Sequence, residues 1–238
     1  MVEKFTFITM RVLVILLCLL SVLGLSAQED SSLLTPDPKY LEDQFYLGTS
    51  YNILLNRPQG ISMRSLSFGL FGGFIKDIPL NKDRNLGFGL GVGYGINSYY
   101  TNLLATETPD GIEYSIIGGD TSFKRSKIET HALEVPLEFR WRTSNAVSHK
   151  FWRIYTGVKF SYIVAPRSKF VSDTIKTSFT NGDIRQFQYG LILSFGYNTF
   201  NLHAYYSLQD LFNDGVQTVD GNPLGFVPLH IGIIFYIL

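Results

Sequence analysis

Charged side chains at alternate positions are the first residues in this sequence that could do chemistry. The segment 128–143 places on one side Glu134, Glu138, Arg140 and Arg142, and on the other Leu133, Val135, Leu137, Phe139 and Trp141. The segment 152–164 adds Arg153 and Lys159 to a charged side of its own. Carboxylates and cations on facing strands can form ion pairs, and they could also relay a proton or an ion.

We interpret these six residues as an inward polar network. A slip of one residue would turn all four charges of 128–143 to the other face. If that face met lipid, each basic residue would cost up to about 2 to 4 kcal/mol, so the register is fixed. The interior of a small barrel has room only for side chains, which favours a packed polar plug over a pore. A proton or ion relay is the alternative.

Histidine and serine offer a second possible chemistry. The sequence has four histidines, His131, His149, His203 and His230. His203 with Ser207 or Ser161 could support acyl transfer, but no spacing favours that role over a buried, hydrogen-bonded imidazole. The histidines lie too far apart in the sequence to indicate a metal site. We therefore expect no catalytic, cofactor-binding or metal-binding residue.

Glycine occupies every second position from Gly87 to Gly95, with large apolar residues in the gaps. This two-residue period predicts a strand with one bulky face and one nearly bare face. A helix would lose roughly 4 to 5 kcal/mol at the five glycines. The spacing also fails the dinucleotide-binding pattern G-x-G-x-x-G, because Val92 stands where the third glycine would be.

Similar alternation recurs in eight segments of roughly ten residues, long enough for a tilted strand to cross a bilayer. These segments are 44–55, 65–76, 86–97, 128–143, 152–164, 185–197, 200–208 and 227–238. The bulky face of each indicates contact with lipid, and the small or polar face indicates a narrow interior. The sequence thus predicts an all-β fold, an eight-stranded antiparallel transmembrane up-and-down β-barrel. A soluble sandwich or lipocalin-like barrel, with the bulky face turned inward, is the alternative.

The lengths of the connections predict the orientation. With both termini in the periplasm, the three longest links, 104–126, 165–184 and 212–226, are all external, and the tight link 198–199 is periplasmic. This asymmetry is typical of outer-membrane barrels. Four aromatic residues flank the predicted periplasmic turns on the lipid side and form a predicted aromatic girdle: Trp141, Trp152, Tyr197 and Phe200.

The first 27 residues have the features of a cleaved secretory signal peptide. Lys4 and Arg11 precede the apolar run 12–25, and small residues follow it. A retained membrane anchor is the alternative, although the run is shorter than the ~20 residues of a spanning helix. We expect three parts, namely a signal peptide at 1–27, a periplasmic N-terminal segment at 28–43 and an outer-membrane barrel domain at 44–238.

Removal of the signal peptide would leave a nearly neutral chain without cysteine. The whole chain has 20 basic and 20 acidic residues; without Lys4, Arg11 and Glu3 it has 18 and 19, a net charge of −1. No basic footprint for nucleic acid follows from this balance. The single cysteine, Cys18, lies in the apolar run, so the mature chain would have no disulfide and no thiolate metal site.

Several stretches carry a resemblance to a known family. They are FGGFIKDIPLNKDRNLGFGLGVGYGINSYYTNL, KRSKIETHALEVPLEFRWRTS, KFWRIYTGVKFSYI and QFQYGLILSFGYNTFNLHAYYSLQDLF. They resemble the PorT family, whose member in gliding bacteria is called SprT, over most of the chain from Phe45 to Leu238. The block from Lys127 to Tyr162 is the most particular to that family. The ending from His230 to Ile237 also resembles the C-terminal insertion signal of outer-membrane proteins.

The resemblance implies an outer-membrane component required for type IX secretion, the route that exports proteins with a C-terminal signal domain, and for gliding motility where the host glides. It implies outer-membrane lipid and other type IX secretion components as partners. It brings no catalytic or cofactor residue. The alternatives are a generic surface barrel that binds a ligand or acts as an adhesin, and a small-barrel lipid-modifying enzyme.

Overall fold

The computed structural model describes residues 43–81, 83–118, 123–143, 152–197 and 200–237. The expected signal peptide at 1–27, and the segment 28–43 except for Asp43, lie outside the described residues. Within the described ranges, no helix is long and apolar enough to cross a membrane. The strands are β1 (Asp43–Leu55), β2 (Phe68–Pro79), β3 (Leu86–Tyr100), β4 (Leu103–Thr108), β5 (Gly111–Ile116), β6 (Arg125–Arg142), β7 (Trp152–Val171), β8 (Lys176–Thr180), β9 (Phe187–Tyr197), β10 (Phe200–Ser207) and β11 (Val227–Ile237).

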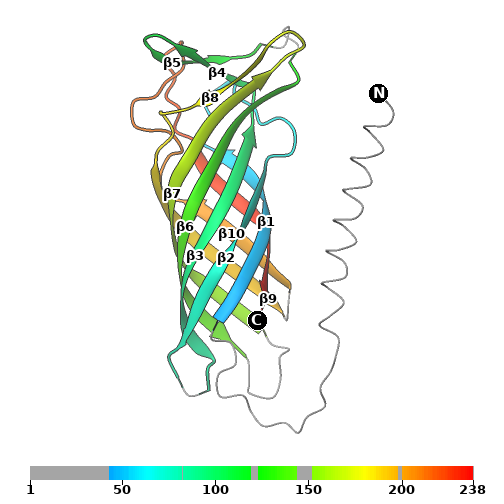
Figure 1. Ribbon diagram of the computed structural model, residues 1–238, viewed down its shortest axis with the longest axis vertical. Coiled ribbons are helices and arrows are strands. Elements are labelled where there is room, and N and C mark those ends of the chain that lie inside the picture. Colours follow the sequence, from blue (N-terminus) through cyan, green and yellow to red (C-terminus); the bar gives the residue numbers. More distant parts are fainter. Residues whose placement is uncertain (1–42, 82, 119–122, 144–151, 198–199, 238) are drawn as a thin grey trace, which may run out of the picture. The chain divides into compact units, whose positions relative to one another are not determined.

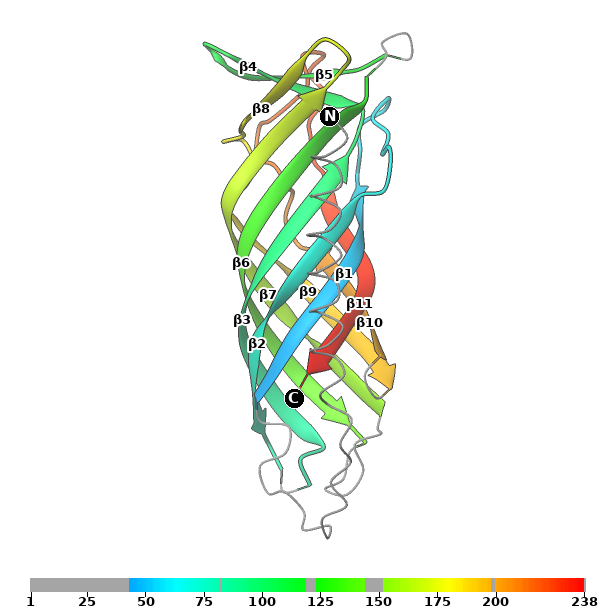
Figure 2. The same cartoon turned by 45° about the vertical axis from the view of Figure 1, so that its right-hand side comes forward.

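Eight of these strands close into an antiparallel barrel (Figures 1 and 2). Around the barrel the order is β1, β2, β3, β6, β7, β9, β10 and β11, and β11 pairs with β1 to close the ring. When β4, β5 and β8 are left out, each barrel strand pairs with the next barrel strand along the chain. This confirms the predicted eight-stranded up-and-down barrel. Closure leaves no free strand edge for lipid to meet.

The long links contain strands that the sequence pattern did not predict. The link 104–126 holds most of the β4–β5 hairpin, which forms a separate two-stranded sheet. In the link 165–184, β7 continues to Val171 and turns back into β8. β6 extends with β7, because Arg125 lies opposite Val171. These extensions keep backbone groups hydrogen-bonded beyond the closed barrel.

The two faces of the glycine strand β3 differ as predicted. Phe88, Leu90, Val92 and Tyr94 point outward, and Val92 is 62% exposed. The glycine positions point inward and are occupied by side chains from other strands. A Cβ atom at Gly89 would lie 2.7 Å from Arg140 Nε, and one at Gly95 would lie 2.7 Å from Glu134 Oε1. The bare face therefore provides the space that the charged side chains of β6 fill.

A large side chain on the inner face of β3 should prevent assembly, whereas the same side chain on the outer face should be tolerated. A Cβ atom at Gly91 would lie 2.8 Å from the carbonyl oxygen of Phe74 and 3.0 Å from Pro136, so Gly91→Phe overfills the lumen. Val92→Phe is the matched control on the lipid side. The measurement is the fraction of heat-modifiable, folded protein after refolding into lipid vesicles. Equal yields for the two variants would contradict the assignment of the faces.

Candidate functional site

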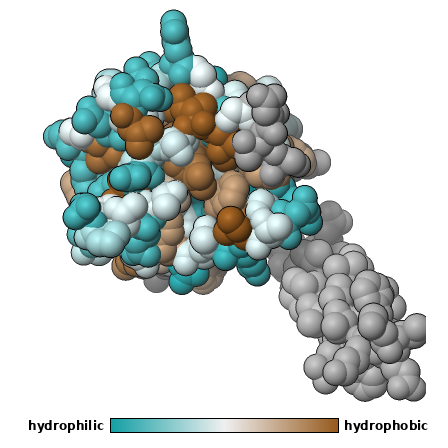
Figure 3. Space-filling model, turned by 90° about the horizontal axis from the view of Figure 1, so that it is seen from above, coloured by the Kyte–Doolittle hydropathy of each residue, from teal (hydrophilic) through white to brown (hydrophobic). Residues whose placement is uncertain are grey.

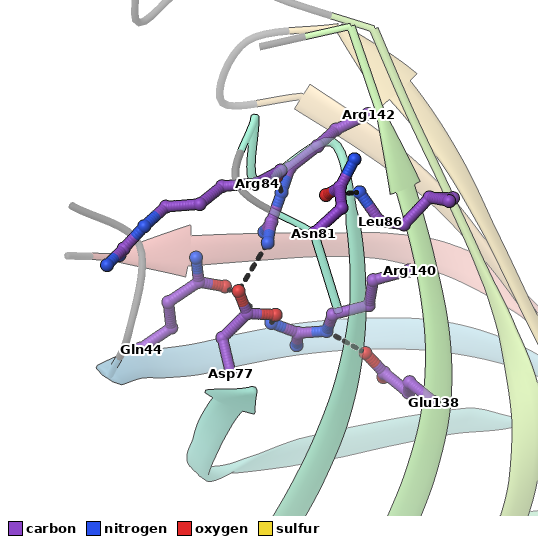
Figure 4. Close-up of polar contacts among 8 residues, drawn as sticks. All are labelled: Gln44, Asp77, Asn81, Arg84, Leu86, Glu138, Arg140 and Arg142. Atoms are coloured by element: carbon purple, nitrogen blue, oxygen red, sulfur yellow. Dashed lines mark hydrogen bonds and ion pairs between the residues drawn. The ribbon is translucent and has the colours of Figure 1, made fainter. Parts of the chain in front are cut away.

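Two buried arginines form a polar layer at the end of the lumen where β6 ends and β7 begins (Figure 4). Arg140 Nε donates to Glu138 Oε2 at 2.9 Å. Arg140 Nη1 lies 3.2 Å from Asp77 Oδ1 and 3.2 Å from Gln44 Oε1. Arg142 Nη2 pairs with the other carboxylate oxygen, Asp77 Oδ2. The layer is a continuous chain of charge-assisted hydrogen bonds, the strong class in which one or both partners are ionised.

Asp77 joins the two arginines, and the sequence pattern did not identify it. The predicted second segment ended at Lys76, one residue too early. Asp77 has the same inward parity as Ile75, so extending the alternation by one position would have found it. Arg142 Nε also donates to the carbonyl of Arg84 at 2.6 Å, which attaches this layer to the connection between β2 and β3.

Two aromatic rings cover the arginines, one on the neighbouring strand β7 and one on the opposite wall. The guanidinium carbon of Arg140 lies 4.5 Å from the ring centroid of Tyr155 on β7 and 5.4 Å from that of Tyr236 on β11. Arg153 lies 6.0 and 5.8 Å from the same two rings. In the order of the eight strands, β6 and β11 are opposite each other. The contact between Arg140 and Tyr236 therefore spans the lumen, with cation–π attraction on top of the ion pairs.

A second layer lies farther along the lumen and is built on one ion pair. Lys159 Nζ donates to Glu134 Oε1 at 2.8 Å. The same ammonium lies 4.5 Å from the ring centroid of Tyr205 on β10 and 5.6 Å from that of Phe71 on β2. The ring of Phe71 also contacts that of His203, with centroids 5.2 Å apart. Side chains from four strands thus meet at this height.

The structure places all six sequence-predicted charged residues in the lumen and divides them between the two layers. Glu138, Arg140, Arg142 and Arg153 belong to the first layer, and Glu134 and Lys159 to the second. The first layer has three guanidinium groups against the two carboxylates of Asp77 and Glu138. Because unpaired charges would cost several kcal/mol each in this buried position, pairing is a condition for folding.

The inward histidines are held by hydroxyl groups. Tyr99 Oη lies 2.8 Å from His230 Nε2, which makes a third contact across the lumen, between β3 and β11. Ser194 Oγ lies 2.8 Å from His203 Nδ1. The serine beside His203 is therefore Ser194 and not Ser207 or Ser161. Of the remaining histidines, His131 lies 2.9 Å from the hydroxyl of Tyr94, and His149 lies outside the described residues.

Neither a catalytic triad nor a metal site emerges from these contacts. In the part of the chain that the structure describes, His203 makes no hydrogen bond to a carboxylate. The described residues also contain no group of three or more His, Cys, Asp or Glu placed to hold a metal ion. The chemistry that the arrangement supports is the closure of the lumen by paired charges and stacked rings.

An apolar cluster covers the opposite mouth of the barrel. Its members come from β1, β3, β4, β5, β6 and the long links, and they include Tyr114, Ile184, Leu211, Phe212 and Phe226. Figure 3 looks onto this end and shows apolar residues between hydrophilic ones across the mouth. Burial raises the pKa of Tyr114, whose hydroxyl lies 3.0 Å from both Asn181 Oδ1 and Asp183 Oδ2. The links are thus packed together over the lumen.

The four aromatic residues of the predicted girdle share one band of the outer surface, at the end of the barrel with the short connections. They are exposed: Trp141, Trp152, Tyr197 and Phe200. Trp152 lies directly opposite Tyr197, and Tyr197 directly opposite Phe200. The rings of Trp152 and Tyr197 have centroids 5.1 Å apart.

Replacing Asp77 with leucine should destabilise the barrel more than replacing Glu138, because Asp77 pairs with both Arg140 and Arg142. We expect Asp77→Leu to cost about 3 to 5 kcal/mol, the usual cost of leaving a buried charge without its partner. Glu138→Leu should cost less, since Arg140 keeps Asp77. Asp83→Leu, at an exposed carboxylate in the neighbouring connection, is the control. The measurement is the urea midpoint of unfolding in lipid vesicles, and equal midpoints for the three variants would contradict the pairing.

Known protein families and solved structures include matches to this chain. Residues 26–213, which include β1 to β10, match the family described as outer membrane protein beta-barrel domain. Among solved structures, the chain is similar to Ail, the attachment invasion locus protein of Yersinia pestis, at 14% identity and a TM-score of 0.37, covering 82% of this chain and 98% of that one. A comparison with curated protein sequences finds no match. The family match covers more than half of the chain, so this protein belongs to the outer membrane protein beta-barrel domain family and is a small barrel integral to the outer membrane.

Proposed function

We propose that this protein is a non-enzymatic component of the type IX secretion system that assembles or stabilises the translocon without itself conducting cargo. The resemblance to the PorT family, which is strongest from Lys127 to Tyr162, is the reason for naming this pathway. Where the host glides, the same role extends to gliding motility. In this proposal the partners are outer-membrane lipid and other components of the secretion system.

The observation that carries the proposal is the packing of the lumen. Contacts cross it at three heights: Arg140 to Tyr236, Lys159 to Phe71, and Tyr99 to His230. Beyond them the apolar cluster lies over the mouth. An eight-stranded barrel has an interior only wide enough for side chains. An exported protein therefore needs another conduit, and the role left to this chain is to bind and position its partners.

The external hairpins offer the surface for such contacts. The β4–β5 hairpin and the β7–β8 hairpin flank a groove of about 540 Å³ whose lining includes Leu104, Phe170, Ile175 and Phe179. In our proposal these hairpins contact the translocon. The girdle of Trp141, Trp152, Tyr197 and Phe200 would anchor the other end at the periplasmic interface, as aromatic belts do. The first 27 residues would direct export and be removed.

A surface barrel that binds a ligand or acts as an adhesin is the second candidate. The same groove favours it, because it opens on the side where the long links lie. The two functions differ in what a deletion strain loses. An adhesin mutant would secrete normally and lose surface binding, whereas a mutant lacking a translocon component would lose secretion.

Loss of the protein should abolish export of type IX substrates while general outer-membrane integrity stays normal. The measurement is the amount of substrates with C-terminal signal domains in the medium of a deletion strain, with and without a plasmid copy of the gene. Resistance to detergent and to large antibiotics is the control for membrane integrity. Normal secretion by the deletion strain would overturn the proposed function.

The purified protein should show no large, steady conductance in a planar bilayer, because its lumen is filled. Shortening the β4–β5 hairpin by the two pairs Thr106–Glu113 and Glu107–Ile112, which keeps Tyr114 and the turn at 108–111, should impair secretion and leave the amount of folded, heat-modifiable barrel in the outer membrane unchanged. An open-channel current would contradict the filled lumen. Normal secretion by the shortened variant would exclude this hairpin as a partner surface.

A further inference from the structure

The outward side chains of β6 and β7 change from apolar to basic above the lipid-facing band. Tyr94, Leu133 and Tyr162 are neighbours in one row across β3, β6 and β7, and they are 42%, 54% and 48% exposed. Aromatic residues at this position are typical of a membrane–water interface. Figures 1 and 2 show β6 and β7 running on past this level toward the end where β4, β5 and β8 lie.

Basic residues occupy the outward positions of the rows above. Arg167 lies opposite Glu129, Lys127 lies opposite Lys169, and in the last row Arg125 and Lys176 both lie opposite Val171. We call this surface the basic face, made of Arg125, Lys127, Arg167, Lys169 and Lys176. His131 lies between it and the aromatic row. Lys127 stands six residues beyond Leu133, about 20 Å along the strand and less along the membrane normal because the strands tilt.

A β-bulge turns two of these cations outward. Between the pairs Ala132–Ile163 and His131–Ala165, Val164 is an extra residue on β7. Before the bulge the odd-numbered residues of β7 face the lumen, as Lys159 does; after it, Ser168 faces inward and Arg167 is exposed. A bulge is the usual means of re-aiming side chains within a strand. Without it, Arg167 and Lys169 would point into the barrel.

The carboxylate within the rows of the basic face neutralises only part of its positive charge. Lys127 and Lys169 face each other directly, an unfavourable arrangement of like charges. Glu129, the one carboxylate in these rows, pairs with both. Burial alone would raise the pKa of Glu129, but hydrogen bonds and charge attraction from the two lysines outweigh it and lower the pKa to about 2. Glu129 therefore stays ionised and holds both ammonium groups in place.

Three cations of the basic face are left available. Arg125, Arg167 and Lys176 are exposed, and in the described part of the chain none of them makes an ion pair. The five cations and one carboxylate give the face a net charge of +4. Asp173, the acidic residue at the nearby turn, pairs with Lys124 at 2.7 Å.

Other arginines at this end are already engaged. Arg185 pairs with Asp214 at 2.6 Å, and Arg57 donates to the carbonyl of Leu54 at 2.7 Å. Arg64 stacks on the ring of Phe123, with the guanidinium carbon 4.8 Å from the centroid. The available positive charge is thus concentrated on one side of the barrel.

We propose that the basic face binds the phosphate groups of lipid A, the glycolipid of the outer leaflet. Arginine and lysine are the usual ligands of phosphate. The face continues directly from the apolar band, so acyl chains can lie against Leu133 and the two tyrosines while the phosphates reach the cations above. A soluble acidic partner could bind the cations, but it would not need an apolar surface directly below them. The inference is independent of the role in secretion.

The test uses the full-length mature protein in nanodiscs of increasing lipid A content, with the unfolding temperature as the readout. Three lipid arms separate the sources of phosphate: lipid A, enzymatically dephosphorylated lipid A, and phosphatidylglycerol at matched charge. The expected result is stabilisation that saturates with lipid A and is absent with the other two. Equal stabilisation by dephosphorylated lipid A or by phosphatidylglycerol would overturn the proposal.

The double variant Arg125→Gln/Arg167→Gln removes two cations that hold no ion pair within the described residues. We expect the lipid A fraction at half-maximal stabilisation to rise about 25-fold, since each basic side chain near an anionic surface contributes about fivefold. Arg57→Gln/Lys124→Gln removes two other exposed cations at this end and should leave that fraction unchanged. An equal loss in both double variants would mean that net charge alone attracts the lipid. If the first variant does not fold, the three lipid arms with the unaltered protein still decide the question.

Discussion

The guanidinium of Arg140 imposes the strictest condition on this barrel, because it is fully buried and must be both paired and given room. Glu138 and Asp77 supply the charge, and the ring of Tyr155 covers the remaining side. The room comes from β3, where a Cβ atom at Gly89 would overlap the guanidinium. The charged strand β6 and the glycine strand β3 therefore depend on each other. A side chain on the inner face of β3 and the loss of a carboxylate on either neighbouring strand, Asp77 on β2 or Glu138 on β6, would disturb the same contact.

The two ends of the lumen are filled by opposite chemistry for one physical reason. Where the strands cross lipid, the outer face must be apolar, so the polar side chains have only the interior left and must satisfy one another there. Where the links reach water, the outer surface can be polar, and apolar residues such as Leu211 and Phe226 are buried inward instead. Burial at that end is favoured by roughly 25 cal/mol per Å² of apolar surface. The order of the layers along the lumen thus follows from the position of the bilayer.

Alternation along the strands was enough to predict the barrel, its strand order and the inward side of β6, because in a closed sheet every strand has one lipid face and one lumen face. It could not predict which side chains contact each other inside the lumen. Asp77 was missed because the apolar pattern weakens at the end of β2, and the roles of Tyr155 and Tyr236 depend on which strands lie opposite each other in the closed ring. The β4–β5 hairpin was missed because it contacts lipid on neither face and so has no strict alternation. Its position is decided by Tyr114, Leu103 and their neighbours in the apolar cluster.

The bulge at Val164 shows how one residue can give a single strand two functions. On β7, Lys159 pairs with Glu134 in the lumen, and ten residues later Lys169 pairs with Glu129 on the outer surface. Both are odd-numbered lysines, and regular alternation would have placed both inside. A second inward lysine at that height would stand beside Leu103 and Ile128 of the apolar cluster, where burying its charge would be costly. The extra residue therefore does two things at once, since it keeps the mouth cluster apolar and moves the surplus positive charge of β7 to the membrane surface.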